Sequence, residues 1–225
     1  MAYVSWNKGL NKKNHPGLAK IAKARSKRNN FAQWQKNHPI KYASLHKSSE
    51  LAEFYGTMLG DGCIEKFART EKLSVSFNSK ETQHIRHVKK MISDIFLKEP
   101  AAQIRNYSHC INLTLYQKNL SSRLKFPTGE KQLHPLGIPH WIRENEKFLI
   151  KCLKGLFETD GDWVIDKKYG TNVMKFTNVI PELLKDVHKS LIGLGFTAHL
   201  GKRRVTISRK SETKKFAEMI KFRLY

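Results

Sequence analysis

Two segments of the chain end in the same arrangement of residue types, an apolar stretch followed by an aspartate and a glycine. They read FYGTMLGDG and LKGLFETDG, and their acids, Asp61 and Asp160, are 99 residues apart. Because glycine commonly ends a helix, both carboxylates are expected at C-terminal helix ends, where backbone carbonyls make the potential negative. A hard divalent cation relieves that repulsion, and Mg²⁺ favours a few carboxylates with phosphate oxygens and water. The pair therefore indicates metal-assisted chemistry at a phosphodiester.

Small residues recur four positions apart on both expected helices. Gly56 and Gly60 share one face of the first helix, and Gly155 and Thr159 share the matching face of the second. Small side chains at this spacing let two helix backbones approach closely, so we expect the helices to pack together and to bring both acids to one place. A single Asp-Gly after a helix is more often a plain turn, but two copies at matching places of a repeat favour a shared site.

The hydrophobic periodicity around these motifs also repeats. In the first half it predicts a helix at 49–59, a strand at 72–78, a helix at 81–96, strands at 103–107 and 111–116, and a helix at 119–126. In the second half it predicts a helix at 146–159, strands at 163–166 and 174–178, a helix at 181–193, a hairpin with strands at 197–200 and 204–208, and a helix from 212. Phe77 and Phe176 are again 99 residues apart. We therefore expect an α+β fold of two pseudo-symmetric αββαββα halves, residues 49–126 and 146–225, joined by a Pro- and Gly-containing linker at 127–145.

The charge of the chain indicates a polyanionic partner. Lys and Arg number 42 against 19 acids, a net charge of +23, and 40% of the 225 residues are hydrophobic, enough to fill a core. The first 49 residues carry eleven Lys or Arg and no acid, so residues 1–48 are predicted to form a basic arm, with a short helix from Leu18 to about Trp34. A solvated tail is the alternative, but aromatic side chains in the arm favour contact with DNA.

Hydropathy and cysteine content exclude several classes of protein. No apolar run approaches 18 residues and the N-terminus has no continuous hydrophobic signal segment, so we expect no membrane partner and no secretion. The three cysteines are widely separated, which indicates reduced thiols rather than a disulfide framework or a zinc site. A cytoplasmic or organellar location in association with DNA follows as the expectation.

The paired motifs within this element order resemble the LAGLIDADG homing endonucleases, specifically the single-chain members with two pseudo-symmetric halves. The resemblance covers residues 49–225, although Leu59 stands in the first copy where an acid often lies. It implies two antiparallel sheets forming a saddle on double-stranded DNA, with the motif helices packed at the centre. It also implies that Asp61 and Asp160 are catalytic and bind Mg²⁺, with Mn²⁺ able to substitute, beside Gly60 and Thr159, and that a monomer makes a staggered double-strand break.

The resemblance also implies that the polar faces of the strands read bases. Alternation supports this independently, because the residues opposite the apolar rows can form hydrogen bonds and include almost no acids. The expected DNA-binding residues are Lys72, Ser74, Ser76, Asn78, Asn112, Thr114, Tyr116, Lys175, Thr177, Arg204, Thr206 and Ser208. An ordinary solvated sheet face is the alternative.

Family active sites also hold basic and amide side chains near the metal. The candidates are Lys80 beside Ser79, Asn178 at the position equivalent to Ser79 by chain count, and Lys131 in a Pro-Thr-Gly-Glu-Lys segment that resembles the family's linker-proximal lysine. For Lys80, an ordinary surface residue is an equal alternative. Glu158 and Asp162 flank the second acid without acidic counterparts in the first half, which favours a supporting or structural role.

The N-terminal arm carries a further resemblance, and two alternative functions remain. Ser5-Trp6-Asn7-Lys8-Gly9-Leu10 and the following Lys/Ala-rich stretch resemble the modular DNA-binding motifs attached to phage and bacterial homing nucleases, which implies extra phosphate or minor-groove contacts. An RNA maturase that binds intron RNA, or a DNA-binding regulator that has lost cleavage, would share the same fold. Because both acids are present, the sequence favours the nuclease.

Overall fold

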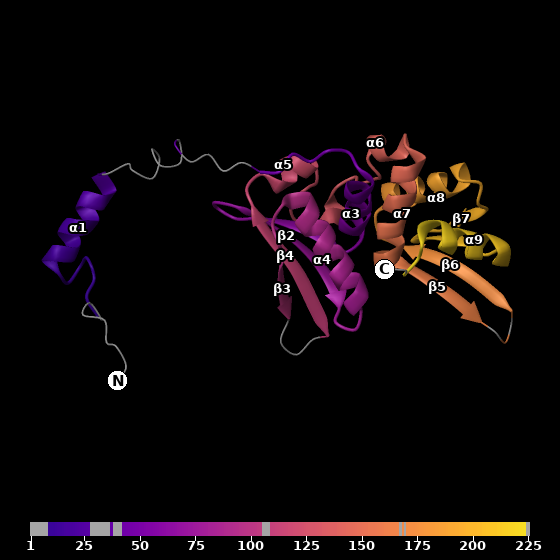
Figure 1. Cartoon of the computed structure of the whole chain (residues 1–225), viewed down its shortest axis with the longest axis horizontal. Helices are drawn as coiled ribbons and strands as arrows, with labels where there is room; N and C mark the ends of the chain where they lie inside the picture. Colours follow the sequence, from indigo (N-terminus) through magenta and orange to yellow (C-terminus); the bar gives the residue numbers. More distant parts are fainter. Residues whose placement is uncertain are drawn as a thin grey trace. The chain divides into compact units, whose positions relative to one another are not determined.

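The computed structural model describes residues 9–27, 37, 42–104, 109–166, 168 and 170–223 (Figure 1). The chain divides into two compact units, residues 1–42 and 43–225. The described part of the first unit includes the helix α1 (Pro16–Lys27), which covers the beginning of the stretch expected to be helical from Leu18; the remainder of that prediction, to about Trp34, lies outside the described residues. Trp6, Phe31 and Trp34 lie outside the described residues. The remainder of this section concerns the second unit.

The first half begins with a capped helix. The Ser48 hydroxyl accepts a hydrogen bond from the Leu51 amide and starts α3 (Ser49–Gly60), which ends at the motif aspartate. The other elements of this half are β1 (Gly62–Lys66), β2 (Glu71–Asn78), α4 (Thr82–Phe96), β3 (Ala101–Ile104), β4 (Cys110–Gln117) and α5 (Leu120–Leu124). The strand expected at 103–107 is therefore β3, which begins two residues earlier, and residues 105–108 lie outside the described part.

The second half repeats the same order. Its first helix, α7 (Glu146–Asp160), is capped by the Asn145 side chain, which accepts from the Phe148 amide. The other elements are β5 (Gly161–Asp166), β6 (Thr171–Thr177), α8 (Pro181–Gly193), β7 (Ala198–Leu200), β8 (Arg204–Ile207) and α9 (Lys210–Ile220). The predicted α+β fold with two αββαββα halves is confirmed, although the periodicity located no strand at the position of β1.

Each half contains one four-stranded antiparallel sheet. The strand orders are β1-β2-β4-β3 and β5-β6-β8-β7, so the two sheets have matching topology. Apolar side chains alternate along the central strands and face the helices, as Leu73, Val75 and Phe77 do on β2 and Met174 and Phe176 do on β6. We call the opposite side of each sheet its outer face.

The segment expected as a linker is packed against the body. It contains a 3₁₀ turn, Lys131–Leu133, and a short helix, α6 (His140–Arg143). Ile138 and Ile142 are buried, and the Asp186 carboxylate on α8 accepts a hydrogen bond from the Ile138 amide at 2.9 Å. This connection therefore holds a defined path between the halves.

The two hairpins that follow the motif helices differ in register. Gly62 lies opposite Val75, whereas Gly161 lies opposite Phe176, so the second hairpin is two residues longer. Chain count pairs Phe77 with Phe176, but the sheet register pairs Val75 with Phe176. The pseudo-symmetry expected from sequence is thus shifted by two residues beside the second motif.

Among the described residues, no helix is long and apolar enough to cross a membrane.

Candidate active site

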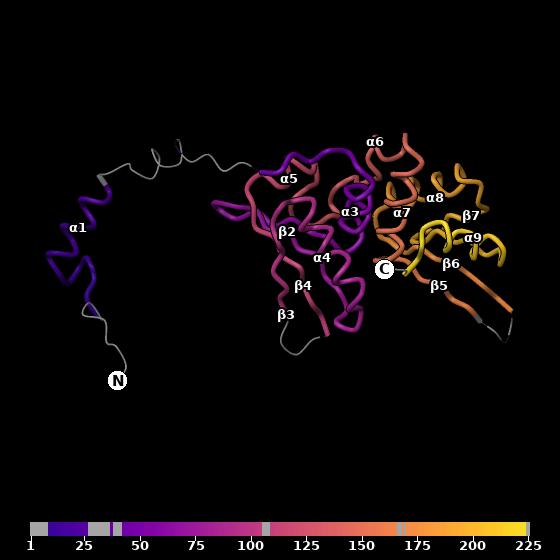
Figure 2. Tube along the Cα trace, in the orientation of Figure 1, coloured from indigo at the N-terminus to yellow at the C-terminus, as the bar shows by residue number. Residues whose placement is uncertain are grey.

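The two motif helices, α3 and α7, lie side by side at the centre of the second unit, with one half of the chain on either side (Figures 1 and 2). A Cβ atom on Gly56 would overlap the backbone carbonyl oxygen of Cys152, and one on Gly155 would overlap that of Glu53. The backbones are therefore in direct contact, which requires glycine at both positions. The close helix packing predicted from the small residues is confirmed.

This contact continues to the C-terminal ends of the helices, where the acids lie. A Cβ on Gly60 would overlap the Thr159 side chain, whose hydroxyl donates to the Gly155 carbonyl at 3.0 Å. Asp61 follows α3 as its cap residue and Asp160 is the last residue of α7. The helix crossing thus brings the two carboxylates to one place, close enough that the charge of Asp61 raises the pKa of Asp160.

The pKa values of both carboxylates are raised, so their ionised forms are disfavoured. Burial and the Asp61 charge raise the pKa of Asp160, a hydrogen bond from Asn178 and the Lys131 charge lower it, and the net result is a pKa of about 6. Asp61 remains exposed at its outer edge, yet the protein around it removes enough water to raise its pKa, against the Lys131 charge. Two adjacent acids with raised pKa values form a site that a cation would stabilise.

The two carboxylates fit a hard divalent ion whose remaining ligands are water and phosphate oxygens. Within the described residues, no cluster of three or more His, Cys, Asp or Glu side chains could enclose a metal. Mg²⁺ and Mn²⁺ accept such sites, because water and phosphate oxygens complete their coordination. Asp61 and Asp160 would hold the ion. The Gly60 carbonyl, predicted as a further ligand, already accepts a hydrogen bond from Lys131, and Thr159 bonds to its own helix.

Lys131 is the basic residue that the fold brings to the acids. Its half-buried ammonium donates to the Met58 and Leu59 carbonyls at 3.2 and 3.0 Å and to that of Gly60, so it binds the carbonyls that α3 leaves without helical partners. Burial lowers the pKa of Lys131, while Asp160 and Asp61 raise it. Lys131, which lies in the connection between the two halves, is therefore held at the C-terminal end of the first motif helix.

Asn178 contacts only one of the two acids. Its Nδ2 donates to Asp160 Oδ2 at 2.7 Å, and its own Oδ1 accepts from the Ile180 amide. Because the second hairpin is two residues longer, the residue of the first hairpin at the same sheet position is Phe77, which is buried, and not Ser79. The two acids therefore have unequal surroundings, which chain count alone did not predict.

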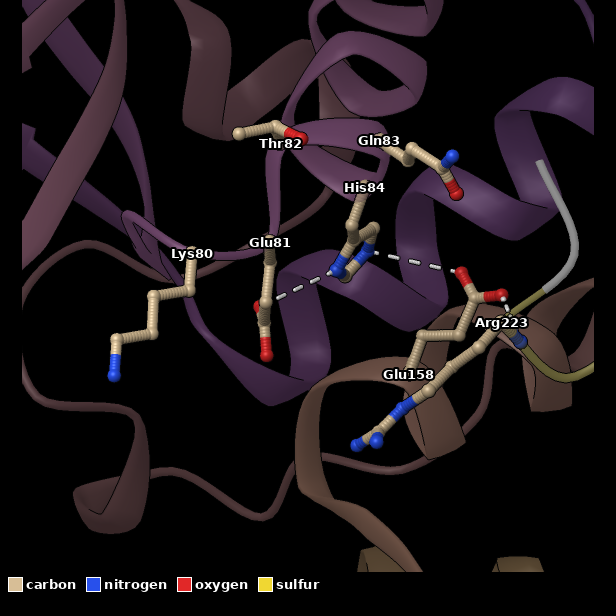
Figure 3. A pocket seen from close by; sticks show the side chains of 7 residues that line it. All are labelled: Lys80, Glu81, Thr82, Gln83, His84, Glu158 and Arg223. Atoms are coloured by element: carbon tan, nitrogen blue, oxygen red, sulfur yellow. Dashed lines mark hydrogen bonds and ion pairs between the residues drawn. The ribbon is translucent and has the colours of Figure 1, made fainter.

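Lys80 lines a separate cavity of about 290 Å³ between the halves. Figure 3 shows the cavity between Glu81 and His84 of the first half and Glu158 and Arg223 of the second, with the Lys80 side chain at its edge. Among the described residues, Lys80 has no hydrogen bond to either acid. The structure thus places Lys131 and Asn178 beside the acids and Lys80 on this neighbouring surface.

A buried ion-pair network crosses the helix interface. Glu53 is 3% exposed, and its carboxylate contacts Lys151 Nζ at 2.8 Å, His87 Nε2 at 2.5 Å and Lys154 Nζ at 3.6 Å. Lys154 Nζ also forms an ion pair with the Glu158 carboxylate at 3.7 Å. Glu158 in turn lies 3.7 Å from His84 Nε2, as the dashed line in Figure 3 marks, and accepts from the Arg223 amide.

Sequence reasoning assigned Glu158 a supporting or structural role and missed the rest of the network. One signal was present: Glu53, Lys154 and Glu158 are charged residues inside otherwise apolar motif helices, and the last two are spaced for a helical i,i+4 pair. Charged side chains at such positions must find partners, because an unpaired buried charge is very costly.

The outer faces of the sheets carry most of the predicted DNA-binding residues. Exposed or half-buried are Lys72, Ser76, Asn78, Tyr116, Lys175, Thr177, Arg204, Thr206 and Ser208. Ser74, Asn112 and Thr114 are buried instead, since they lie on the central strands β2 and β4 beneath neighbouring side chains. Thr114 uses its hydroxyl to donate to the Ala101 carbonyl of β3. The accessible polar surface of the first sheet is therefore narrower than the sequence predicted.

Lys131→Met is expected to lower any metal-dependent cleavage rate by about 100-fold, because it removes an ordered cationic donor beside the acids. The apolar stem of methionine keeps the packing, so DNA affinity should fall less than tenfold. Single-turnover cleavage and a binding titration measure both effects. Lys147→Met, exposed at the opposite end of α7, is the matched control. A Lys131→Met rate within threefold of wild type would contradict this role.

The network makes a second prediction, on stability. Burial raises the pKa of Glu53, but hydrogen bonds from His87 and Lys151 and the Lys154 charge outweigh it and hold the pKa at about 2. A depressed acid pKa stabilises the fold fully above its unfolded value near 4.5, and this contribution is lost as the pH falls towards about 2. Glu53→Gln should therefore lower the unfolding free energy at pH 7 by about 3 kcal/mol.

Chemical denaturation at several pH values tests this window. The difference between wild type and Glu53→Gln should be constant above about pH 5 and shrink below pH 4.5. Glu50→Gln, an exposed change in the first turn of the same helix, should remain within about 0.5 kcal/mol of wild type throughout. A pH-independent difference for Glu53→Gln would show that its ionisation does not stabilise the interface.

Comparison with protein families matches one half of this architecture in sequence. Residues 147–221 match the model of the LAGLIDADG-like domain family, a segment that contains all but the first residue of α7, the second sheet and α9. A search of curated protein sequences finds no match. The family match therefore covers the second motif and its acid, and the first half is compared through its structure.

Several solved structures share the fold of both halves. Variants of the homing endonuclease I-DmoI are similar at a TM-score of 0.53 and 21% identity, covering 76% of this chain and 94% of theirs. The homing endonuclease I-WcaI bound to its DNA recognition sequence gives 0.57 and 16%, covering 87% and 88%. The N-terminal LAGLIDADG domain of DUF199/WhiA gives 0.51 and 15%, covering 77% and 82%. These likenesses establish the LAGLIDADG fold; I-DmoI itself has been solved with DNA and calcium or manganese.

Proposed function

We propose that this chain is a site-specific DNA endonuclease of the homing type, which makes a staggered double-strand break in a long target by Mg²⁺-dependent hydrolysis. The observation that carries the proposal is the pair of acids, Asp61 and Asp160, with raised pKa values at the crossing of two motif helices. That crossing lies between two sheets whose outer faces present cationic and hydrogen-bonding side chains. The family match and the endonuclease structures with DNA support the same activity.

In this mechanism the protein positions two phosphodiesters, one near each acid. Asp61 and Asp160 would hold a divalent ion, which would supply activated water and stabilise the leaving oxygen. Asn178 orients the Asp160 carboxylate through the 2.7 Å hydrogen bond. Lys131 neutralises part of the negative charge that phosphate adds to the site. The two acids have different surroundings. The Asn178 amide therefore lies near the DNA strand cut at Asp160, and within the described residues no equivalent amide lies near the strand cut at Asp61.

The outer faces bind the major groove on either side of the cut. Lys175 and Arg204 on the second sheet, and Lys72 on the first, contact phosphates or base edges, while hydroxyl and amide groups add hydrogen bonds. The basic arm, residues 1–48, extends the contact along the duplex. A single chain supplies both acids, so the active species is a monomer, and Mn²⁺ replaces Mg²⁺.

The experiment is selection of cleaved sequences from a randomised duplex library, with Mg²⁺, with Mn²⁺ and with a chelator. We expect one long consensus, cut on both strands with a stagger, and no cleavage with the chelator. Tight binding of a consensus without cutting in either metal would contradict the nuclease and favour a regulator. Preferential binding of structured intron RNA over duplex DNA would favour a maturase.

A further inference from the structure

The outer faces of the two sheets differ at one matched position. The fourth residue after each motif aspartate is Glu65 on β1 and Val164 on β5, and their cross-strand partners are Lys72 and Val173. Glu65 and Lys72 form an ion pair at 2.9 Å. The second sheet therefore replaces a charged pair by two directly opposed valines.

Strand alternation places both valines on the outer face. Trp163, next to Val164, packs against the core, and Met174, next to Val173, is buried among the helices. Val164 is 37% exposed and Val173 is half-buried, so methyl groups of the pair reach solvent. Val164 therefore presents part of its apolar surface to solvent on the outer face.

The residues around the valine pair indicate the chemistry of the partner that would contact it. In the next cross-strand row of the same face, Lys175 lies opposite Thr206 and Asp162, and Arg204 follows beside Thr177. Although Asp162 lies beside Lys175, the other groups around this small apolar patch are cationic or carry hydroxyls, which fits a polyanion with isolated apolar groups. In the major groove of DNA, the 5-methyl group of thymine is that apolar group, and aliphatic side chains contact it.

We propose that Val164 and Val173 recognise the 5-methyl group of a thymine in the half of the target bound by the second sheet. This inference rests on the proposed DNA-binding function. Four residues of extended strand separate Val164 from Asp160, about 13 Å at 3.3 Å per residue, which corresponds to about four base-pair steps. In the other half of the target, Glu65 and Lys72 meet the equivalent base pair with charged groups and do not require a methyl.

Replacement of thymine by deoxyuridine tests the methyl group alone, since the base-pairing and groove hydrogen-bonding groups stay the same. The duplexes carry the selected consensus with one substitution each, at every thymine three to five base pairs from the cut in both halves. Affinity is measured with Ca²⁺ and cleavage rate with Mg²⁺. At one position in the second half, we expect deoxyuridine to weaken binding about fourfold, the value for one buried methyl group.

Variants then assign the effect to the valine pair. In the Val164→Ala/Val173→Ala double variant, thymine and uracil duplexes should bind equally. Ile165→Ala is the matched control, because Ile165 is an exposed aliphatic residue on the same strand but on the opposite face. Wild type and Ile165→Ala should discriminate against uracil to the same extent, and the double variant should keep the thermal stability of wild type within a few degrees.

Three results would overturn the inference. They are a consensus with no thymine at this distance in the second half, a uracil effect that persists in the double variant, and an equal effect at the matched position of the first half. Binding of a consensus without cutting would overturn the nuclease proposal alone. Deoxyuridine would then be placed at every thymine of the bound consensus, and the affinity measurements would still decide the role of the valines.

Discussion

Asp160→Asn and Asp61→Asn are each expected to lower the cleavage rate by about 1000-fold. The change would remove one of the two carboxylates proposed to hold the ion, and a bound metal contributes several kcal/mol of transition-state stabilisation. The carboxamide is nearly isosteric, so the helix ends should keep their packing. Asparagine also removes the repulsion between the two acids, so DNA binding should be retained or strengthened.

The measurement combines single-turnover cleavage of both strands with a binding titration on the same duplex. Asp94→Asn, an exposed change on α4 away from the helix crossing, is the control and should cut at the wild-type rate. If either motif variant cuts both strands at more than a tenth of the wild-type rate, the assignment of these acids would be wrong. Loss of both binding and cutting would indicate misfolding, which thermal denaturation detects.

Gly155→Ala is expected to cost about 3 kcal/mol or more of unfolding free energy. The added methyl group would overlap the Glu53 carbonyl oxygen and lie 2.7 Å from the Thr57 amide nitrogen, both of them backbone atoms of α3. Backbone in a packed helix cannot move aside as a flexible side chain can, so the two motif helices must separate. Their separation would also displace the acids, and cleavage should fall with stability.

Gly193→Ala provides a matched control for this substitution. Gly193 ends α8, and an added Cβ would meet no atom within 4 Å. Because alanine also restricts the unfolded chain, this variant should equal wild type or gain up to about 1 kcal/mol. Denaturant unfolding of both variants measures the contrast. Equal stability of the two would show that the helix backbones are not in close contact.

The fold was predictable from sequence because its signals are local and repeated. Alternating apolar residues on β2 and β4 and helical periodicity around the two Asp-Gly motifs determine element types, and the repeat determines their order. Small residues at Gly56 and Gly155 predicted the helix contact, because few other residues permit such an approach. Chain count then placed Asp61 and Asp160 correctly, since each acid lies at the C-terminal end of its own helix.

The support around the acids was less predictable because it comes from distant segments. Lys131 and Asn178 were candidates among several, and only their approach to the helix ends distinguishes them from Lys80. The two-residue register difference was invisible to chain count, because a longer hairpin leaves the alternation of apolar and polar residues unchanged. Burial of Ser74 likewise depends on the strands and side chains that flank it.

By itself, therefore, the sequence determined the two acids, the repeat and the cationic character of the chain, all of which follow from residue type and spacing along the backbone. Only the tertiary structure decided which side chains share the site and how unequal its two halves are. The physical reason is that hydrogen bonds such as Asn178 to Asp160, and burial of charges such as Glu53, depend on distances across the fold that no local pattern encodes.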